Sequence, residues 1–198
     1  MKILIEVGTD VDFVDNDVDF VDIDEDSDEH TALFFATKNN KVDAVKFLLE
    51  RGANPNHRDF EQCTALMKAV DYGNFEITEA LLGAGADPSA QDEYSNSVLY
   101  YHFHGDGSGN SFPESFKDSD PRIAELLLKA GADLNKEFGD TSIEFDHDSR
   151  THFSRTSNPL MYIAENNNKV LTSRSEHARL LIKYGADVDK KIIMEKLL

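Results

Sequence analysis

Basic residues and cysteine are both scarce in this chain of 198 residues. Its 20 Lys and Arg stand against 38 Asp and Glu, which gives a formal net charge of −18 at pH 7. Binding to nucleic acid needs clustered cations that neutralise phosphates, and an anionic membrane surface would repel so acidic a chain. The single cysteine, Cys63, excludes an intramolecular disulfide framework and a metal cluster built on cysteines. We therefore expect a reducing compartment.

Long apolar runs are absent as well. The apolar stretch near the N-terminus, residues 3–5, is too short for a signal peptide. No stretch approaches the roughly 20 apolar residues that span a bilayer. These absences favour a cytoplasmic location, while export by a route that needs no leader would leave no trace in the pattern. With nucleic acid and membrane disfavoured, a basic protein partner, or simply high solubility, fits the charge better.

One short sequence motif recurs along the chain and is its most prominent feature. It reads LLERGANPN at residues 48–56, LLGAGADPS at 81–89, LLKAGADLN at 127–135 and LIKYGADVD at 181–189. A fainter copy, LIEVGTDVD, begins at residue 4. Each copy is an apolar helix end followed by a glycine, the residue that most readily adopts the left-handed conformation that terminates a helix.

The spacing of these phrases identifies the repeat. Gly52 and Gly85 are 33 residues apart, and twelve residues after each comes a hydroxyl residue, Thr64 or Ser97, that opens a short apolar helix. TALFFA at Thr31 and NPLMYIA in the last unit hold the same place. The period and these openings resemble the ankyrin repeat and its T-P-L-H-x-A motif, in which Thr caps a helix. Only the last unit keeps the proline, and none keeps the histidine.

The resemblance implies an all-α solenoid of stacked helix-turn-helix units with hairpin loops. We expect residues 1–29 to hold the end of a partial repeat and an acidic loop, and residues 30–198 to form about four repeats with a C-terminal cap. A single unit cannot bury its own apolar face, so neighbouring units must share one core. The predicted core residues are Phe47, Leu48, Leu66, Ile77, Leu81, Leu99, Ile123, Leu126, Leu127, Leu160 and Leu181.

Three insertions interrupt the repeat. The spacings between successive turn glycines exceed one period by 11, 13 and 21 residues. The first insertion lies in the hairpin before unit one, and the second lies within residues 104–121. The third is divided between the hairpin at residues 136–157 and the helices of unit four. The chain also begins inside what resembles the second helix of a preceding repeat, so we expect either a fragment of a larger array or an acidic segment that shields the N-terminal end.

Residues 10–29 form a strongly acidic segment in which eleven of twenty residues are Asp or Glu. The calcium-loop pattern fails here, because Ser27 replaces the turn glycine and Leu33 replaces the final glutamate when the loop starts at Asp22. Repulsion between like charges favours a solvated loop. An acidic strip with alternating Val and Phe that docks a basic partner remains open, and so does a calcium-responsive loop.

Neither a metal centre nor an active site is predicted. His102, His104 and Asp106 form an H-x-H-x-D run, but a zinc site needs three or four converging ligands. The run at residues 146–152 gives the same result. Cys63 has no histidine at a diagnostic spacing, and no hydrolase, metalloprotease or kinase motif occurs. We expect a non-catalytic chain without cofactor or metal.

The resemblance also implies a binding surface, because ankyrin proteins contact partners through hairpin tips and the inner face of the first helices. Among the residues at these places, we expect Phe60, Tyr72 and Tyr94 to be anchors, since aromatic residues dominate interface energetics. The predicted contact residues are Asp28, His30, Lys38, Asn39, Phe60, Glu61, Cys63, Asp71, Tyr72, Glu93, Tyr94 and Asn96.

These observations favour a monomeric protein–protein interaction module that binds a basic protein, and not nucleic acid or a membrane. One alternative is an immunity-type inhibitor of a basic toxin or nuclease. Another is an exported effector, or a fragment of a scaffold, that recruits host proteins. The repeats themselves do not specify a partner.

Overall fold

The computed structural model describes residues 10–13, 30–104, 120–135, 159–160, 163 and 171–187. This part of the chain is helical, and its only β-type pairings are two isolated bridges, one in each of two hairpins. The prediction of an all-α solenoid is confirmed. The described helices are α2 (Ala32–Lys38), α3 (Val42–Glu50), α4 (Ala65–Asp71), α5 (Phe75–Gly83), α6 (Val98–His104), α7 (Pro121–Lys129) and α9 (Leu171–Lys183).

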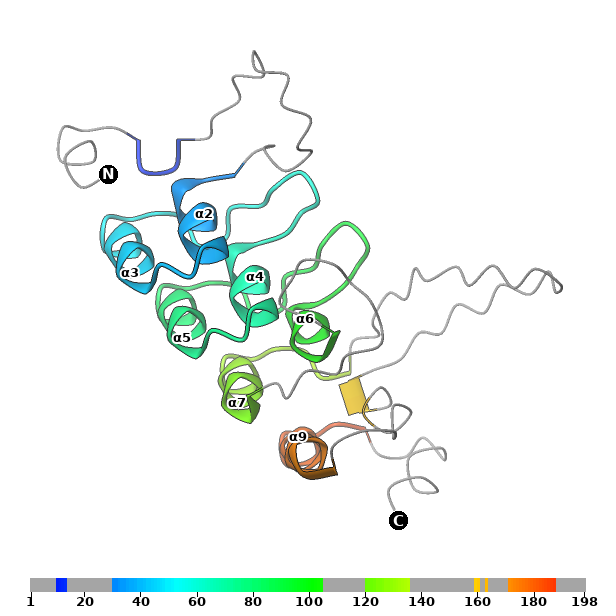
Figure 1. Cartoon of the computed structure of the whole chain (residues 1–198). Helices are drawn as coiled ribbons and strands as arrows, with labels where there is room; N and C mark the ends of the chain where they lie inside the picture. Colours follow the sequence, from blue (N-terminus) through cyan, green and yellow to red (C-terminus); the bar gives the residue numbers. More distant parts are fainter. Residues whose placement is uncertain are drawn as a thin grey trace, which may run out of the picture.

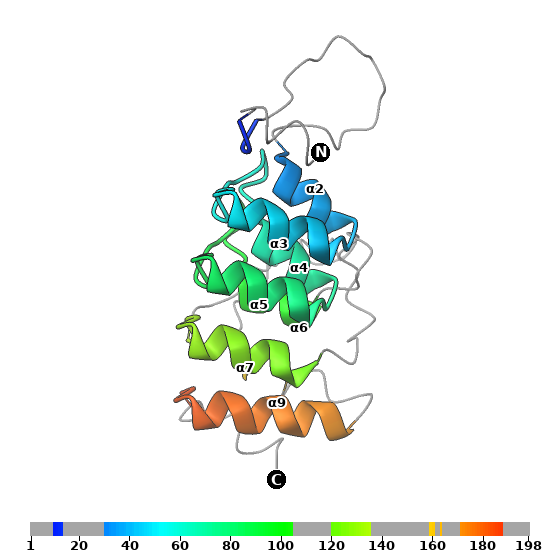
Figure 2. The same cartoon turned by 90° about the vertical axis from the view of Figure 1, so that its left-hand side faces the viewer.

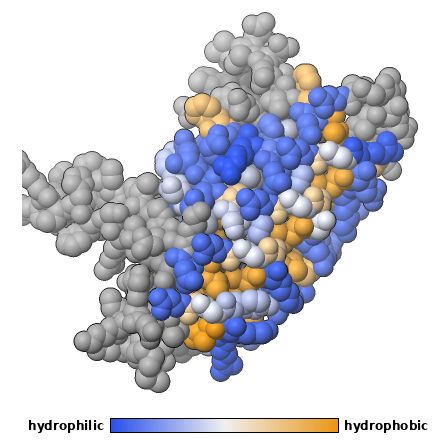
Figure 3. All heavy atoms as spheres, turned by 180° about the vertical axis from the view of Figure 1, so that it is seen from behind, coloured by the Kyte–Doolittle hydropathy of each residue, from blue (hydrophilic) through white to orange (hydrophobic). Residues whose placement is uncertain are grey.

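The helices form two columns. Helices α2, α4 and α6 stack in one column, and α3, α5, α7 and α9 stack in the other (Figure 1). Viewed from the side, the helices of the second column lie one above the other and nearly parallel (Figure 2). Units one to three each contribute one helix to each column, and unit four contributes α9 to the second, so neighbouring units cover each other's apolar faces. From behind, apolar residues form a band that runs along the stack between hydrophilic residues (Figure 3).

Hydroxyl side chains begin the first helices of units one to three, as the sequence predicts. The Thr31 hydroxyl accepts a hydrogen bond from the backbone N–H of Phe34 at 3.3 Å, and Thr64 accepts from Met67 at 3.3 Å. Such caps satisfy backbone donors that the first turn of a helix leaves without partners. The register of the repeat is therefore encoded locally at each helix start.

Glycine ends the second helix of each unit. Gly52 has φ of 87°, a conformation that costs a residue with a Cβ atom more than it costs glycine. Its N–H donates to Leu49 O at 3.0 Å, while the N–H of Ala53 donates to Leu48 O at 3.0 Å. This pair of bonds is the Schellman motif, which turns the chain sharply out of the helix and into the hairpin.

Side chains link the turns of successive units. The backbone N–H of Asn54 donates to Asp12 Oδ1 at 2.9 Å, and the N–H of Asp87 donates to Asn56 Oδ1 at 2.7 Å. Asp12 thus makes the same contact with the turn of unit one that Asn56 makes with the turn of unit two. Residues 10–13 therefore lie against unit one as the turn of unit one lies against unit two.

The core runs through the whole stack. Nine of the eleven predicted core residues are buried, from Leu48 in α3 to Leu181 in α9. The prediction is wrong for Phe47 and Leu126, which are half-buried. They occupy the same repeat position, one residue before the buried leucine, at the outer edge of the second helix. The Arg51 guanidinium lies 4.9 Å from the centroid of the Phe47 ring, and this contact accounts for part of the burial of Phe47.

Candidate protein-binding surface

A buried aspartate organises the tip of each described hairpin. Asp59 Oδ1 accepts from the backbone N–H of Cys63 at 2.7 Å. Asp92 Oδ1, one period later, accepts from the N–H groups of Tyr94 at 2.9 Å and Asn96 at 2.8 Å. An aspartate that bonds to its own backbone a few residues ahead fixes a tight turn. The two tips therefore have defined conformations before any partner arrives.

The two hairpins are also bonded to each other. The backbone N–H of Glu93 donates to Glu61 O at 2.9 Å, and Arg58 Nη1 donates to Gln91 O at 2.9 Å. The second hairpin is also bonded to the helix that follows it, because the Tyr101 hydroxyl in α6 donates to Asp92 Oδ2 at 2.7 Å. The tips thus form one connected edge, and a partner would meet a preorganised surface.

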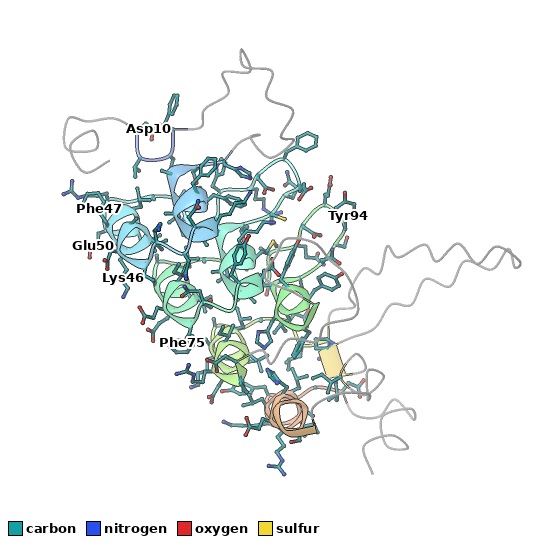
Figure 4. The ribbon with its side chains drawn as sticks, viewed as in Figure 1. Asp10, Lys46, Phe47, Glu50, Phe75 and Tyr94 are labelled. Atoms are coloured by element: carbon teal, nitrogen blue, oxygen red, sulfur yellow. The ribbon has the colours of Figure 1, made fainter. Side chains whose placement is uncertain are left out.

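Aromatic side chains project from this edge. Phe60 on the first hairpin is 70% exposed, and Tyr94 on the second is 49% exposed. Figure 4 shows Tyr94 on the hairpin side of the molecule, opposite Lys46, Phe47 and Phe75 on the second helices. Exposed aromatic residues on a rigid edge are typical anchors for a protein interface.

The sequence reasoning missed a third exposed aromatic residue. Phe35 in α2 is 45% exposed, while its neighbour Phe34 is buried. Adjacent residues on a helix point about 100° apart, so with Leu33 and Phe34 both buried, Phe35 is turned a further step away from the core. Its ring contacts His30 edge-on, with ring centroids 5.3 Å apart.

Three predicted contact residues lie inside the molecule. Cys63, Asp71 and Asn96 are 1%, 7% and 7% exposed. Cys63 and Asn96 are at the base of their hairpins, where the chain folds back onto the helices, and Asn96 Nδ2 donates to Asp92 Oδ2 at 2.9 Å. Asp71 is the last residue of α4. Their side chains lie within the hairpins and helices and not at the surface.

The other predicted residues lie at the surface or partly so. Lys38 and Tyr72 are half-buried at the ends of α2 and α4, and Asn39 is exposed. His30 is half-buried, stacks on Phe34 with ring centroids 4.1 Å apart, and places Nε2 3.5 Å from Asp59 Oδ2. Asp28, the calcium-loop residues from 14 onward and the run at 146–152 lie outside the described residues.

Charge is distributed unequally between the two sides of the stack. The tips, residues 59–62 and 92–95, carry four carboxylates and no basic side chain, with Glu61 and Glu93 exposed. The Tyr94 hydroxyl hydrogen-bonds to the Glu93 carboxylate, which raises the pKa of Tyr94 and keeps it neutral. On the second helices acids and bases are paired instead, as in the bridge of 3.3 Å between Lys129 and Glu125. The hairpin edge is thus the acidic, aromatic side.

Cys63 is expected to resist thiol reagents in the folded protein. Burial raises the pKa of its thiol to about 11, and a contact of 3.3 Å between Sγ and the Tyr101 hydroxyl lowers it only in part. The thiolate is the reactive form, so at pH 8 we expect thiol–disulfide exchange with a small disulfide reagent to be about a hundredfold or more slower in the native protein than in denaturant. Rates measured with a chromogenic disulfide would contradict this burial if the two states reacted equally fast.

Comparison with known proteins identifies the repeat. Residues 1–92 match the family described as ankyrin repeats (3 copies). The chain belongs to the ankyrin repeat family. It is 32% identical over 97 residues to the putative ankyrin repeat protein R664 of Acanthamoeba polyphaga mimivirus, an alignment that covers 48% of this chain and 56% of that protein. It is 35% identical over 152 residues to the mouse (Mus musculus) ankyrin repeat and SOCS box protein 14, covering 77% of this chain and 22% of that one.

A third relative is the human transient receptor potential cation channel subfamily A member 1. It is 44% identical over 103 residues, which are 52% of this ankyrin-repeat chain and 8% of the channel. The chain thus spans about half the length of the viral relative and much less of the larger ones. The similarity establishes the repeat, whose members are generally protein–protein interaction modules and typically non-catalytic.

Two further properties of the described residues bear on other functions. None of the helices described for this ankyrin-repeat chain combines the length and apolarity needed to cross a bilayer. Within the same residues, no three His, Cys, Asp or Glu side chains gather as metal ligands would.

Proposed function

We propose that this ankyrin-repeat chain is a non-catalytic module that binds a basic protein through its hairpin edge. Phe60 and Tyr94 are the anchors, and the carboxylates of Glu61 and Glu93 beside them attract cationic side chains. Tyr72, Lys38 and Asn39 at the ends of the first helices complete the surface. The observation that carries the proposal is the exposure of Phe60 and Tyr94 on two tips that buried aspartates hold rigid.

The physical argument has two parts. A rigid tip loses little conformational entropy on binding, so more of the contact energy of an aromatic anchor appears as affinity. An aromatic face beside a carboxylate also suits Lys or Arg, because the ring quadrupole and the carboxylate attract the same cation. Complementary charge chiefly speeds association and selects among partners, and salt screens it over about 10 Å at 0.1 M.

Replacing Phe60 or Tyr94 with alanine is expected to weaken binding of the partner by about thirtyfold or more. Truncating an anchor residue costs about 2 kcal/mol or more of binding free energy. The chain is immobilised, and the partner is captured at low salt from an extract of the source organism. The captured protein is then released at high salt and identified. Its affinity for the wild type and each variant is measured by calorimetry.

A matched control is Ile182→Ala. Ile182 is 48% exposed on α9, away from both tips, so its truncation should leave affinity unchanged. A captured protein that is basic, stoichiometric and lost in the tip variants supports the proposal. A partner retained equally by Phe60→Ala and Ile182→Ala would overturn the choice of surface, and an acidic partner that salt does not release would overturn the role of charge.

A further inference from the structure

Two histidines from distant parts of the chain meet inside the stack. Nε2 of His102 in α6 and Nε2 of His177 in α9 are 3.0 Å apart, with ring centroids separated by 5.1 Å. The side chains are 3% and 0% exposed. The two residues are 75 positions apart in sequence, and the contact joins the first helix of unit three to the second helix of unit four. The pair thus links the last unit to the one before it.

An aromatic ring lies against the pair. The Phe103 ring packs edge-on against both imidazoles, with centroids 4.9 Å from His102 and 5.5 Å from His177. Within the described part of the chain, Nδ1 of His102 is buried without a hydrogen-bond partner. A hydrogen bond between two neutral imidazoles needs one N–H and one bare nitrogen. The contact between the two Nε2 atoms satisfies that bond, and Nδ1 of His102 has no described acceptor for an additional proton.

Charged groups near the pair do little to offset this. Of the charged groups described on α4, α7 and α9, only Asp120 at the start of α7 acts on the pKa of His102, and it favours the protonated form. Its carboxylate is already engaged by the Arg122 guanidinium. Burial is the largest effect and the proximity of His177 the next, and together they lower the pKa of His102 to about 3. His102 is therefore held neutral at pH 7.

The pair does not make a metal site. Zinc requires three or four protein ligands or an open position filled by water. No third His, Cys, Asp or Glu gathers with these two in the residues that the structure describes. Two imidazole nitrogens at hydrogen-bonding distance are satisfied by one shared proton, so the observation concerns protonation.

We propose that the His102–His177 pair is an acid-sensitive clasp, which holds α9 on the stack at neutral pH and releases it when the solution is acidified. A proton added at Nδ1 of His102 would place a positive charge in a buried site, where that nitrogen has no described partner. Detachment of α9 carries His177 into water and leaves His102 accessible, and there the charge is solvated. Acid thus favours the detached arrangement of the last unit.

The pH window follows from the two states. A histidine in water titrates near pH 6.5, whereas the stacked His102 resists protonation until about pH 3. The clasp therefore contributes its full stability above about pH 6.5 and loses it as the pH falls towards 3. In that window the proton that His102 takes up on release shifts the equilibrium by about tenfold per pH unit.

Amide hydrogen exchange of the full chain tests the clasp. Protection factors of α9 and α3 are compared between pH 7 and pH 4, after correction for the intrinsic pH dependence of exchange. We expect protection in α9 to fall about tenfold per pH unit relative to α3, where no such pair exists in the described structure. A constant ratio of α9 to α3 protection over this range would overturn the proposal.

Variants separate the clasp from general acid destabilisation. In the double variant His102→Gln, His177→Gln, the two amides can hydrogen-bond but neither titrates, so the acid-dependent loss in α9 should disappear. His57→Gln, on the first hairpin, is the matched control and should keep it. If the double variant fails to fold, the histidine resonances of the wild type decide. A His102 that titrates near pH 6.5 while α9 stays protected would contradict the clasp.

Discussion

Truncation of Leu81 to alanine is expected to lower the free energy of unfolding by about 2 to 5 kcal/mol, the range for a buried leucine. Leu81 in α5 is 0% exposed, and its helix lies between α3 and α7 in the second column. The cavity would therefore weaken packing on both sides of the unit. In a solenoid each unit is stabilised mainly by its neighbours, so a defect in the middle of the stack uncouples the units above and below it.

Leu82, the next residue, is the matched control. It is half-buried, and Leu82→Ala should cost about 1 kcal/mol. Urea denaturation followed by circular dichroism measures both variants. Equal losses for the two leucines would contradict the assignment of Leu81 to the core and Leu82 to the edge. A broadened or two-step transition in Leu81→Ala would be consistent with uncoupled units.

Replacing Asp92 with alanine is expected to cost about 3 kcal/mol of stability. The carboxylate accepts from two backbone N–H groups, from Asn96 Nδ2 and from the Tyr101 hydroxyl, all between 2.7 and 2.9 Å. Alanine leaves these donors without their acceptor in a buried place, and each unsatisfied group costs about 1–3 kcal/mol, part of which relaxation and water recover. The hairpin that presents Tyr94 would lose its fixed conformation.

The control for this change is Glu93→Ala. Glu93 is exposed and its carboxylate supports no buried donor, so its effect on stability should stay within about 0.5 kcal/mol. Thermal unfolding of the two variants measures the difference. A loss for Asp92→Ala as small as that for Glu93→Ala would show that the aspartate does not hold the tip. Asp92→Ala should also weaken partner binding without altering any contact residue, because Tyr94 is no longer held in place.

The sequence predicts the repeat well because its signals are local. A turn glycine, a capping threonine and an apolar helix act within a few residues of each other, so Thr31, Thr64 and Gly52 could be assigned without a structure. The buried aspartates of the hairpins carry an equally local signal, since Asp59 and Asp92 are one period apart, yet they were not recognised.

Orientation and long-range contact are harder to predict. Cys63 and Asn96 occupy hairpin positions that often face a partner, but the fold of the hairpin turns their side chains inward. The contact between His102 and His177 depends on the path of the chain through the insertions that separate them in the sequence. No periodicity of the sequence specifies that contact. The insertions therefore limit sequence reasoning most near the C-terminal unit.

Site-specific photo-crosslinking tests the central claim most directly. A benzophenone-bearing phenylalanine placed at Phe60 preserves an aromatic ring at the first tip, and the same residue at Ile182 probes the outer surface of α9. The chain is mixed at low salt with an extract of the source organism and the mixture is illuminated. The crosslinked protein is then identified. We predict a crosslink to one basic protein from position 60, lost at high salt, and none from position 182. Crosslinking of that protein from position 182 and not from position 60 would contradict binding through the hairpin edge.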